Sequence, residues 1–391
     1  MNILFFMNHY PDSRNGGIET VTRILSEQFH KKGHIVHIRY LFNSQYAHSE
    51  DSIFKSCEQI KETEIAQQIS NAVELYNIQF IINQSLFFAS PILKEAIRGL
   101  NCFLITEYHN KPTLTPPTIK EVISSSDTTL IKKILILSTY PLFASRSKRI
   151  LRNRHKDSYH VSDCTILLSE QYVPEYSNMM QIDTDKLFVL NNPIRDNLTL
   201  NPHELEYKEN TILMVTRLDE KQKCIIKALK VWQHISRDFP NWKFKIVGSG
   251  PDELKIKKFV KDNAIKNVEF YPAQSPETYY RNSSIFLMTS RNEGWPNTLN
   301  EAMRLGCVPV VINSFSAVND IVGNGKDGII IPQSSDETEI INSAIALTKL
   351  IKDKKTLQNM AINACKKTER LSETIIAEEW IKLFERILSK H

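Results

Sequence analysis

Two glutamates, Glu293 and Glu301, lie eight residues apart around the predicted start of a helix. The apolar run 284–290 before them has the length and the β-branched residues of a buried parallel strand, and Pro296 suits the first turn of a helix. The loop that carries Glu293 is therefore predicted to open at the carboxyl end of a strand. Ligands bind at these ends in open α/β sheets.

A diphosphate fits the predicted N-terminus of this helix, because the amides of Asn297, Thr298 and Leu299 would offer hydrogen bonds and the positive end of the helix dipole. Glu301, about one turn further, is placed to bind a ribose, and Glu293 faces the group that the diphosphate carries. A carboxylate beside phosphates is repelled unless hydroxyl groups donate to it, and a hexose supplies them. We interpret the segment as a nucleotide-sugar site; the alternative is an amphipathic helix with two solvated glutamates.

The composition excludes several classes of protein. The chain has 391 residues, 41% hydrophobic and 24% charged, which is enough for two globular domains, and its net charge of +5 is too small for a nucleic-acid-binding protein. The six cysteines have no paired spacing, so we expect reduced thiols in a cytoplasmic protein and neither disulfides nor a metal site. No signal peptide is evident and no apolar run reaches the ~18 residues of a membrane span, so a soluble or peripheral protein is expected.

Short apolar runs alternate with helical stretches along the whole chain, which predicts an α/β fold built from βαβ units. The predicted strands are 3–7, 35–40, 80–83, 102–106, 165–169 and 187–190 in the first half, and 211–216, 243–247, 268–271, 285–289 and 308–312 in the second. The proline-containing stretch 191–210 is predicted to link the halves. Near the C-terminus, an apolar stripe from Ile376 to Leu388 predicts a helix that must bury itself on one of the domains.

Other candidate residues also follow predicted strands. Gly16–Gly17 come after the first strand and open a helix, where glycines let the backbone approach a phosphate closely. His109 follows a later strand. Arg217 directly follows strand 211–216, with Lys221 and Lys223 beyond it, a layout that can hold two cations against a leaving diphosphate. The alternatives are a plain loop-to-helix turn, a structural histidine and solvated loop charges.

Together these motifs resemble the retaining glycosyltransferases of family 4, which have the GT-B fold. The resemblance covers nearly the whole chain. The residues that carry it are Gly16–Glu19, Ser162–Asp163, Ser169, Asn192–Pro193, Val215–Leu218, Gly248–Pro251, Glu293–Ala302, Gly306–Val310 and Asp327–Gly328. It implies two doubly wound, Rossmann-like domains that face each other across a cleft. Residues 1–195 would bind the acceptor, residues 196–371 the nucleotide-sugar, and helix 372–391 would cross back onto the N-terminal domain.

For the site, the resemblance implies that Arg217 and a lysine hold the donor diphosphate. It also implies that Glu293 contacts the donor hexose, that Glu301 binds the ribose and that His109 lies near the transferred sugar. The catalytic candidates are thus His109, Arg217, Lys223 and Glu293, and the donor-binding candidates are Gly16, Gly17, Arg217, Lys223, Asn297, Thr298, Leu299 and Glu301.

The chain departs from the family pattern at three positions. The family lysine usually stands five residues after the arginine, where this chain has Gln222; we prefer Lys223 to Lys221 as its substitute, which requires a loop one residue longer. Thr216 and Pro272 stand where glycines are common, and Pro272 puts the contact to the base in doubt.

We therefore predict a retaining hexosyltransferase in the cytoplasm. It would transfer a sugar from a nucleotide-sugar, with a UDP-sugar as the expected donor, to a saccharide or lipid-linked saccharide in cell-surface polysaccharide or glycolipid synthesis. No metal is expected, because two cations neutralise the leaving group. The segment Asp183–Asp185 is similar to the metal-binding DxD of another glycosyltransferase fold, but we do not interpret it as a metal site, because it lies in a polar loop just before a strand. The alternatives are a GT-B relative such as a UDP-sugar epimerase or phosphorylase, and a non-catalytic sugar-binding module. A nicotinamide enzyme is disfavoured, because no strand is followed by a full GxGxxG.

A basic segment suggests where the acceptor lies. Six Lys or Arg fall within the eleven residues 146–156, beside the apolar segments Ile134–Leu137 and Leu142–Phe143. Such a segment can lie on an anionic bilayer, so we predict peripheral docking at the inner face of the plasma membrane. The alternative is a solvated helix face that serves solubility.

Overall fold

The computed structural model describes residues 1–391 except 13, 15, 43–51, 116–129 and 391, and it does not describe the side chains of 130–138 and 202. The chain divides into two compact units. The first unit comprises Met1–Leu167, Tyr172–Val189 and Phe384–His391, and the second comprises Leu168–Gln171 and Leu190–Leu383. The boundary predicted between residues 195 and 196 lies a few residues beyond Val189.

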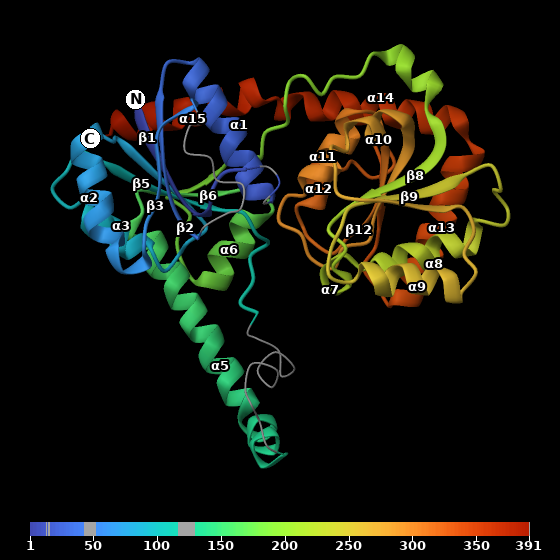
Figure 1. The fold of residues 1–391 in the computed structure, drawn as a ribbon, viewed down its shortest axis with the longest axis horizontal. Coiled ribbons are helices and arrows are strands. Elements are labelled where there is room, and N and C mark those ends of the chain that lie inside the picture. The colour runs from blue at the N-terminus through green and yellow to red at the C-terminus, as the bar shows by residue number, and fades with distance from the viewer. Residues whose placement is uncertain (13, 15, 43–51, 116–129, 391) are drawn as a thin grey trace. The chain divides into compact units, whose positions relative to one another are not determined.

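The first unit is built on a seven-stranded parallel sheet with the order β3-β2-β1-β4-β5-β6-β7. Its strands are β1 (Asn2–His9), β2 (Ile35–Phe42), β3 (Phe54–Gln59), β4 (Phe80–Gln84), β5 (Phe103–Tyr108), β6 (Cys164–Leu167) and β7 (Leu187–Val189). Its helices are α1 (Gly17–Lys31), α2 (Ile65–Tyr76), α3 (Ser90–Ala96), α5 (Leu130–Val161) and α6 (Tyr172–Met180). In Figure 1, α2 and α3 cover one face of this sheet and α1 covers the other. The central part of β1, Ile3–Met7, is apolar and buried because helices cover both of its faces.

The second unit is built on a six-stranded parallel sheet with the order β10-β9-β8-β11-β12-β13. Its strands are β8 (Glu209–Val215), β9 (Lys243–Val247), β10 (Val268–Tyr271), β11 (Ser283–Met288), β12 (Val308–Ile312) and β13 (Ile329–Ile331). Its helices are α7 (Glu220–Lys223), α8 (Ile225–Ile235), α9 (Glu253–Asp262), α10 (Glu277–Asn282), α11 (Asn297–Arg304), α12 (Val318–Ile321), α13 (Asp336–Lys352) and α14 (Lys354–Thr368). Two parallel α/β units confirm the predicted fold class.

Helix α15 (Glu373–Leu388) shares its residues between the units. Near its start, Thr374 Oγ1 donates to Asp196 Oδ2 at 2.6 Å within the second unit. Near its end, the ring of Phe384 packs on Phe29 of α1 and Phe80 of β4, with centroid separations of 5.7 and 4.5 Å. These contacts confirm that the C-terminal helix packs back onto the N-terminal unit, and they explain its buried apolar stripe.

Two strands were absent from the sequence prediction. Strand β3 carries Lys55, Ser56, Glu58 and Gln59 and lies at the edge of its sheet, so it has no apolar run to reveal it. Strand β13 has only three residues. The predicted strand 165–169 was wrong at its end: β6 stops at Leu167, and Leu168–Gln171 belongs to the second unit.

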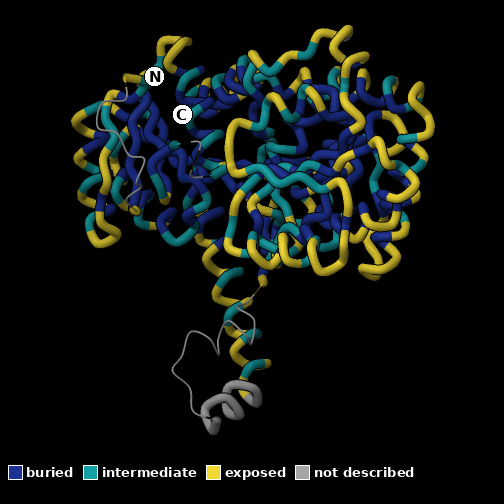
Figure 2. The backbone as a smooth tube through the Cα atoms, turned by 45° about the vertical axis from the view of Figure 1, so that its right-hand side comes forward, coloured by how far each residue is buried: buried dark blue, intermediate teal, exposed yellow. Residues whose placement is uncertain are grey.

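The long helix α5 has two different halves. Its C-terminal half packs on the first sheet through His155, Ser158 and Tyr159, which are buried. Most residues from Thr139 to Ile150 are exposed (Figure 2). Pro141 lies within the helix. Among the described residues, no helix is both long enough and apolar enough to cross a membrane.

His155 lies in an aromatic cage. Its Nδ1 is 3.1 Å from the hydroxyl of Tyr176, and its ring centroid is 4.0 Å from that of Phe87 and 5.3 Å from that of Tyr108. Burial lowers the pKa of His155 from its usual 6.5 to about 4, because the charged imidazole is poorly solvated among these rings.

We expect this histidine to make the protein less stable in acid. The unfolded chain takes up a proton at the usual pKa of His155, whereas the folded chain does so only near pH 4, so stability falls as the pH drops through this window. For His155 alone the loss between about pH 7 and about pH 5 is about 2 kcal/mol. Urea unfolding at both pH values should show a smaller loss for His155→Phe than for the wild type. His160→Gln, at an exposed histidine of the same helix, should behave like the wild type; equal losses in all three proteins would contradict the assignment.

Candidate functional site

Two loops meet at the carboxyl edge of the second sheet. One follows β8 and carries Arg217 and α7, and the other follows β11 and carries Glu293. Because β8 and β11 are neighbouring parallel strands, both loops leave the sheet at the same edge. The amide of Arg291 donates to the carbonyl of Gln222 at 2.8 Å and Thr289 Oγ1 donates to the carbonyl of Cys224 at 2.9 Å, so the two loops are held together.

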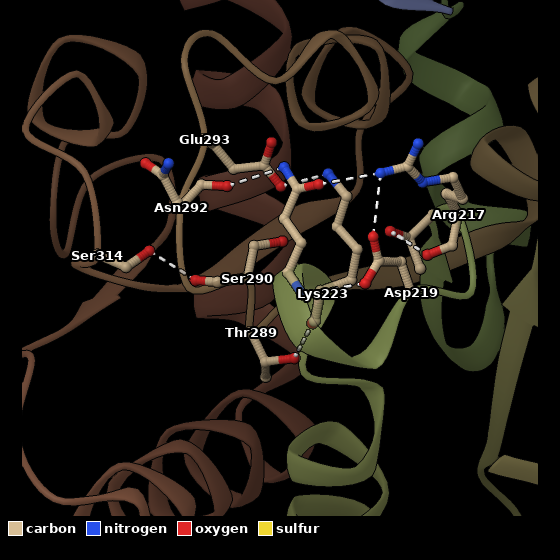
Figure 3. A network of polar contacts seen from close by, with 10 residues as sticks. Arg217, Asp219, Lys223, Thr289, Ser290, Asn292, Glu293 and Ser314 are labelled. Atoms are coloured by element: carbon tan, nitrogen blue, oxygen red, sulfur yellow. Dashed lines mark hydrogen bonds and ion pairs between the residues drawn. The ribbon is translucent and has the colours of Figure 1, made fainter. Parts of the chain in front are cut away.

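An ion pair joins Lys223 of the first loop to Glu293 of the second. Lys223 Nζ lies 2.7 Å from Glu293 Oε1, and the two side chains are only 18% and 10% exposed (Figure 3). The next residue, Cys224, has φ of 50°, a left-handed conformation that is strained for a residue with a side chain. This turn separates α7 from α8, and it follows directly on Lys223. Lys221 is exposed by comparison, and Lys223 is the lysine that lies beside Glu293.

Arg217 takes a more exposed position, with 62% of its side chain accessible. Its Nη2 donates to Asp219 Oδ2 at 3.1 Å and to Gln222 Oε1 at 3.2 Å (Figure 3). Gln222 also donates through Nε2 to the carbonyl of Asn292 at 3.3 Å. The residue at the usual lysine position therefore links the arginine to the loop that carries Glu293.

Glu301 lies on α11 and accepts a hydrogen bond from Tyr280 Oη at 3.3 Å. Burial raises the pKa of Glu301, and the Tyr280 hydrogen bond only partly offsets that effect. Burial also raises the pKa of Tyr280 well above its usual value. A carboxylate in such surroundings gains from further hydroxyl donors, which is what a ribose offers.

Helix α11 differs in detail from its predicted start. It begins at Asn297, and Pro296 is its extended N-cap rather than a residue of its first turn. The amide of Leu299 donates to the carbonyl of Pro296 at 3.1 Å, so it is already used within the turn, contrary to the prediction. The side chain of Asn297 accepts from Asn192 Nδ2 at 2.9 Å. The binding of an anion by the amides of Asn297 and Thr298 stays a prediction.

Three candidate residues lie in the first unit. Gly16 precedes α1, and a Cβ added there would come within 2.8 Å of Glu19 Oε2. Gly17 is the first residue of α1. His109 follows β5 and is buried. The structure thus joins Lys223 to Glu293 in the second unit, whereas these three residues belong to the other unit.

Sequence reasoning missed several partners. Asp219 is only two residues from Arg217, and Tyr280 gave no signal because α10 has no regular apolar pattern.

The described residues contain no group of three or more His, Cys, Asp or Glu that could hold a metal ion. Asp183 and Asp185 are exposed just before β7.

Comparisons with known proteins show what this chain is similar to. Residues 198–367 match the family described as Glycosyl transferases group 1, so the second unit carries that domain. An uncharacterized glycosyltransferase of Haemophilus influenzae is 32% identical over 200 residues, 50% of this chain and 54% of that protein. A poly(glycerol-phosphate) alpha-glucosyltransferase of Bacillus subtilis is 25% identical over 243 residues, 60% of this chain and 35% of that protein. The chain spans about half or less of the length of these curated relatives.

A solved structure extends the likeness to both units. The crystal structure of HepE from Anabaena in complex with UDP matches 99% of this chain and 100% of that chain, with a TM-score of 0.74 and 13% sequence identity. At this identity the likeness concerns the fold alone. It confirms the predicted GT-B fold.

Proposed function

From the polar network on the second sheet and the domain that carries it, we propose that the protein is a retaining hexosyltransferase. It would transfer a sugar from a UDP-sugar to a saccharide or lipid-linked saccharide acceptor in the synthesis of a cell-surface polysaccharide or glycolipid. The observation that carries the proposal is the Lys223–Glu293 pair beside Arg217 at the carboxyl edge of β8 and β11. UDP is favoured as the nucleotide because the solved structure with the same fold binds it.

The chemistry assigned to these residues is stabilisation of a leaving group. As the bond between the sugar carbon and the diphosphate oxygen breaks, negative charge grows on the diphosphate. Arg217, Lys223 and the N-terminus of α11 stabilise that charge. The departing phosphate oxygen takes the proton of the acceptor hydroxyl, whose oxygen bonds to the sugar carbon on the same face. Glu293 orients the hexose through its hydroxyl groups, and Glu301 holds the ribose.

Lys223 must then exchange partners. In the structure its ammonium is paired with Glu293. When the diphosphate binds, it competes for the same ammonium, and Glu293 turns to the donor hydroxyls instead. A carboxylate that loses its cation beside phosphates needs these hydroxyl donors, so the exchange couples recognition of the sugar to recognition of the diphosphate. No step of this scheme requires a metal.

We expect mass spectrometry to detect sugar transfer when the protein is incubated with UDP-hexoses and candidate glycan or glycolipid acceptors. Arg217→Ala should lower kcat by about 10²–10³, because it removes one donor to the leaving group. Lys221→Ala, at an exposed lysine of the same loop, is the control and should stay close to the wild type. Epimerised or phosphorolysed donor without any transfer product would contradict the proposal and favour one of the other GT-B activities.

We further propose that α5 docks the protein on an anionic membrane that carries the acceptor. Arg146, Lys148 and Arg149 are exposed on this helix, and no Asp or Glu lies between residues 130 and 156. Leu142 and Phe143, one turn earlier, are 76% and 41% exposed, so apolar and basic side chains lie close together. The predicted apolar segment Ile134–Leu137 lies outside the described side chains. Charge attraction and insertion of these apolar side chains would act together at a lipid surface.

Co-sedimentation with liposomes tests the docking. The protein should pellet with vesicles that contain anionic lipid, and less as salt rises, because exposed charges are screened over ~8–10 Å. Changing Arg146, Lys148 and Arg149 to glutamine should release it, since each basic residue near the surface contributes about 1 kcal/mol. Changing three exposed lysines of α9, Lys255, Lys257 and Lys258, is the matched control for net charge. Equal recovery with neutral and anionic vesicles would remove the membrane proposal and leave the transferase proposal untouched.

A further inference from the structure

Gln222, the third residue of α7, uses all of its polar groups at the carboxyl edge of the second sheet. Its amide donates to Asp219 Oδ1 at 3.3 Å, and its carbonyl accepts from the amide of Arg291 at 2.8 Å. Its side chain accepts from Arg217 Nη2 at 3.2 Å and donates to the carbonyl of Asn292 at 3.3 Å. The residue thus joins the loop after β8 to the loop after β11 through both its backbone and its side chain.

The side chain of Arg217 is held although it is largely open to solvent. It is 62% exposed, and a long side chain with that much access to water has many rotamers, which opposes any contact that needs one of them. In the structure the guanidinium is fixed, because Nη2 donates to both Asp219 Oδ2 and Gln222 Oε1 (Figure 3). These bonds use the two hydrogens of Nη2 and leave those of Nε and Nη1 for a ligand.

The two acceptors of Arg217 have different roles. Asp219 is the N-cap of α7 and lies in the same loop as the arginine, so its contact does not set the distance to the neighbouring loop. Gln222 sets that distance, since its Nε2 binds the carbonyl of Asn292, the residue before Glu293. The position of the guanidinium relative to the loop that carries Glu293 therefore depends on Gln222.

The two side-chain contacts of Gln222 require an amide. The contact to Arg217 needs an acceptor and the contact to Asn292 needs a donor, and a primary amide offers one of each. A carboxylate would turn an oxygen toward the carbonyl of Asn292, and an ammonium would turn a cation toward the guanidinium. Among side chains of this length, glutamine is the one that meets both requirements.

We propose that Gln222 is a positioning residue of the transferase, which holds the guanidinium of Arg217 against the loop that carries Glu293. The inference rests on the proposed function. It adds to that function a neutral residue that acts only through Arg217, since its own polar groups are already used. A cation that is held in place stabilises the charge of a leaving diphosphate better than a mobile one, because it does not reorganise at the moment of reaction.

Gln222→Met tests the proposal, because methionine keeps the length of the side chain and removes both contacts. We expect kcat for sugar transfer to fall about three- to tenfold, as for one lost hydrogen bond. The affinity for UDP should fall by less than kcat, because charge on the diphosphate grows toward the transition state. The midpoint of urea unfolding should stay close to that of the wild type, since both contacts are exposed.

Gln233→Met is the matched control. Gln233 is an exposed residue of α8 whose side chain donates to the carbonyl of Asn263 at 3.4 Å, so the same substitution removes a similar contact outside the two loops. It should change neither kcat, nor the affinity for UDP, nor the midpoint of unfolding.

A double-mutant cycle with Arg217→Ala shows whether Gln222 acts through the arginine. In the Arg217→Ala protein, Gln222→Met should lower kcat no further, because the group that it positions is absent. Equal losses in both backgrounds would overturn the proposal, as would an unchanged kcat in the single variant. So would a lowered midpoint of unfolding together with equal losses of kcat and UDP affinity, which would make Gln222 a purely structural residue.

Nitrogen NMR relaxation of the arginine side chains adds a readout that needs no substrate. The Nε signal of Arg217, assigned with Arg217→Lys, should have a lower order parameter in Gln222→Met than in the wild type and in Gln233→Met. Equal order parameters in the three proteins would overturn the proposal. If the wild type transfers no sugar from any donor, the proposed function fails, and the order parameters still decide whether Gln222 holds Arg217.

Discussion

The ion pair between Lys223 and Glu293 is the contact on which the proposed activity depends. It exists because two neighbouring parallel strands, β8 and β11, end at the same edge of the second sheet and release their loops side by side. Both groups are mostly buried, so neither is well solvated, and a buried ion that loses its partner costs several kcal/mol. A ligand that replaces this contact must therefore offer an anion for the lysine and donors for the glutamate at once. A nucleotide-sugar carries both.

Neighbouring residues of the second unit fix the loops that carry this pair. The strained turn at Cys224 ends α7 directly after Lys223, and Gln222 joins Arg217 to the backbone of the opposite loop. The first unit also has a strained residue beside a candidate side chain. Ser85, at the end of β4, has a left-handed conformation and accepts a hydrogen bond from the amide of His109, at the end of β5. Both groups of polar residues lie at the carboxyl ends of parallel strands, where ligands bind in open α/β sheets.

Sequence patterns predicted most of the fold, because buried parallel strands such as β1 and β12 are continuous apolar runs. They did not reveal β3, because this strand lies at the edge of its sheet, where polar residues are tolerated, and has no apolar run. For the site, the order of Arg217, Glu293 and Glu301 along the chain was informative, whereas the choice between Lys221 and Lys223 depended on the exact path of a short loop. Tyr280 and Gln84, the partners of Glu301 and His109, were invisible, since each is distant in sequence from the residue it contacts and becomes a neighbour only through the sheet.

The most direct test of the central claim is calorimetric titration of UDP into the wild type and three variants. If the diphosphate takes Lys223 from Glu293, Lys223→Met should weaken UDP binding by about tenfold or more, as for one lost charge-assisted hydrogen bond. Glu293→Gln, which frees the lysine and removes a nearby negative charge, should bind UDP as tightly as the wild type or more tightly, and Lys221→Met should change little. Equal weakening by Lys223→Met and Glu293→Gln, or full affinity in Lys223→Met, would contradict the account.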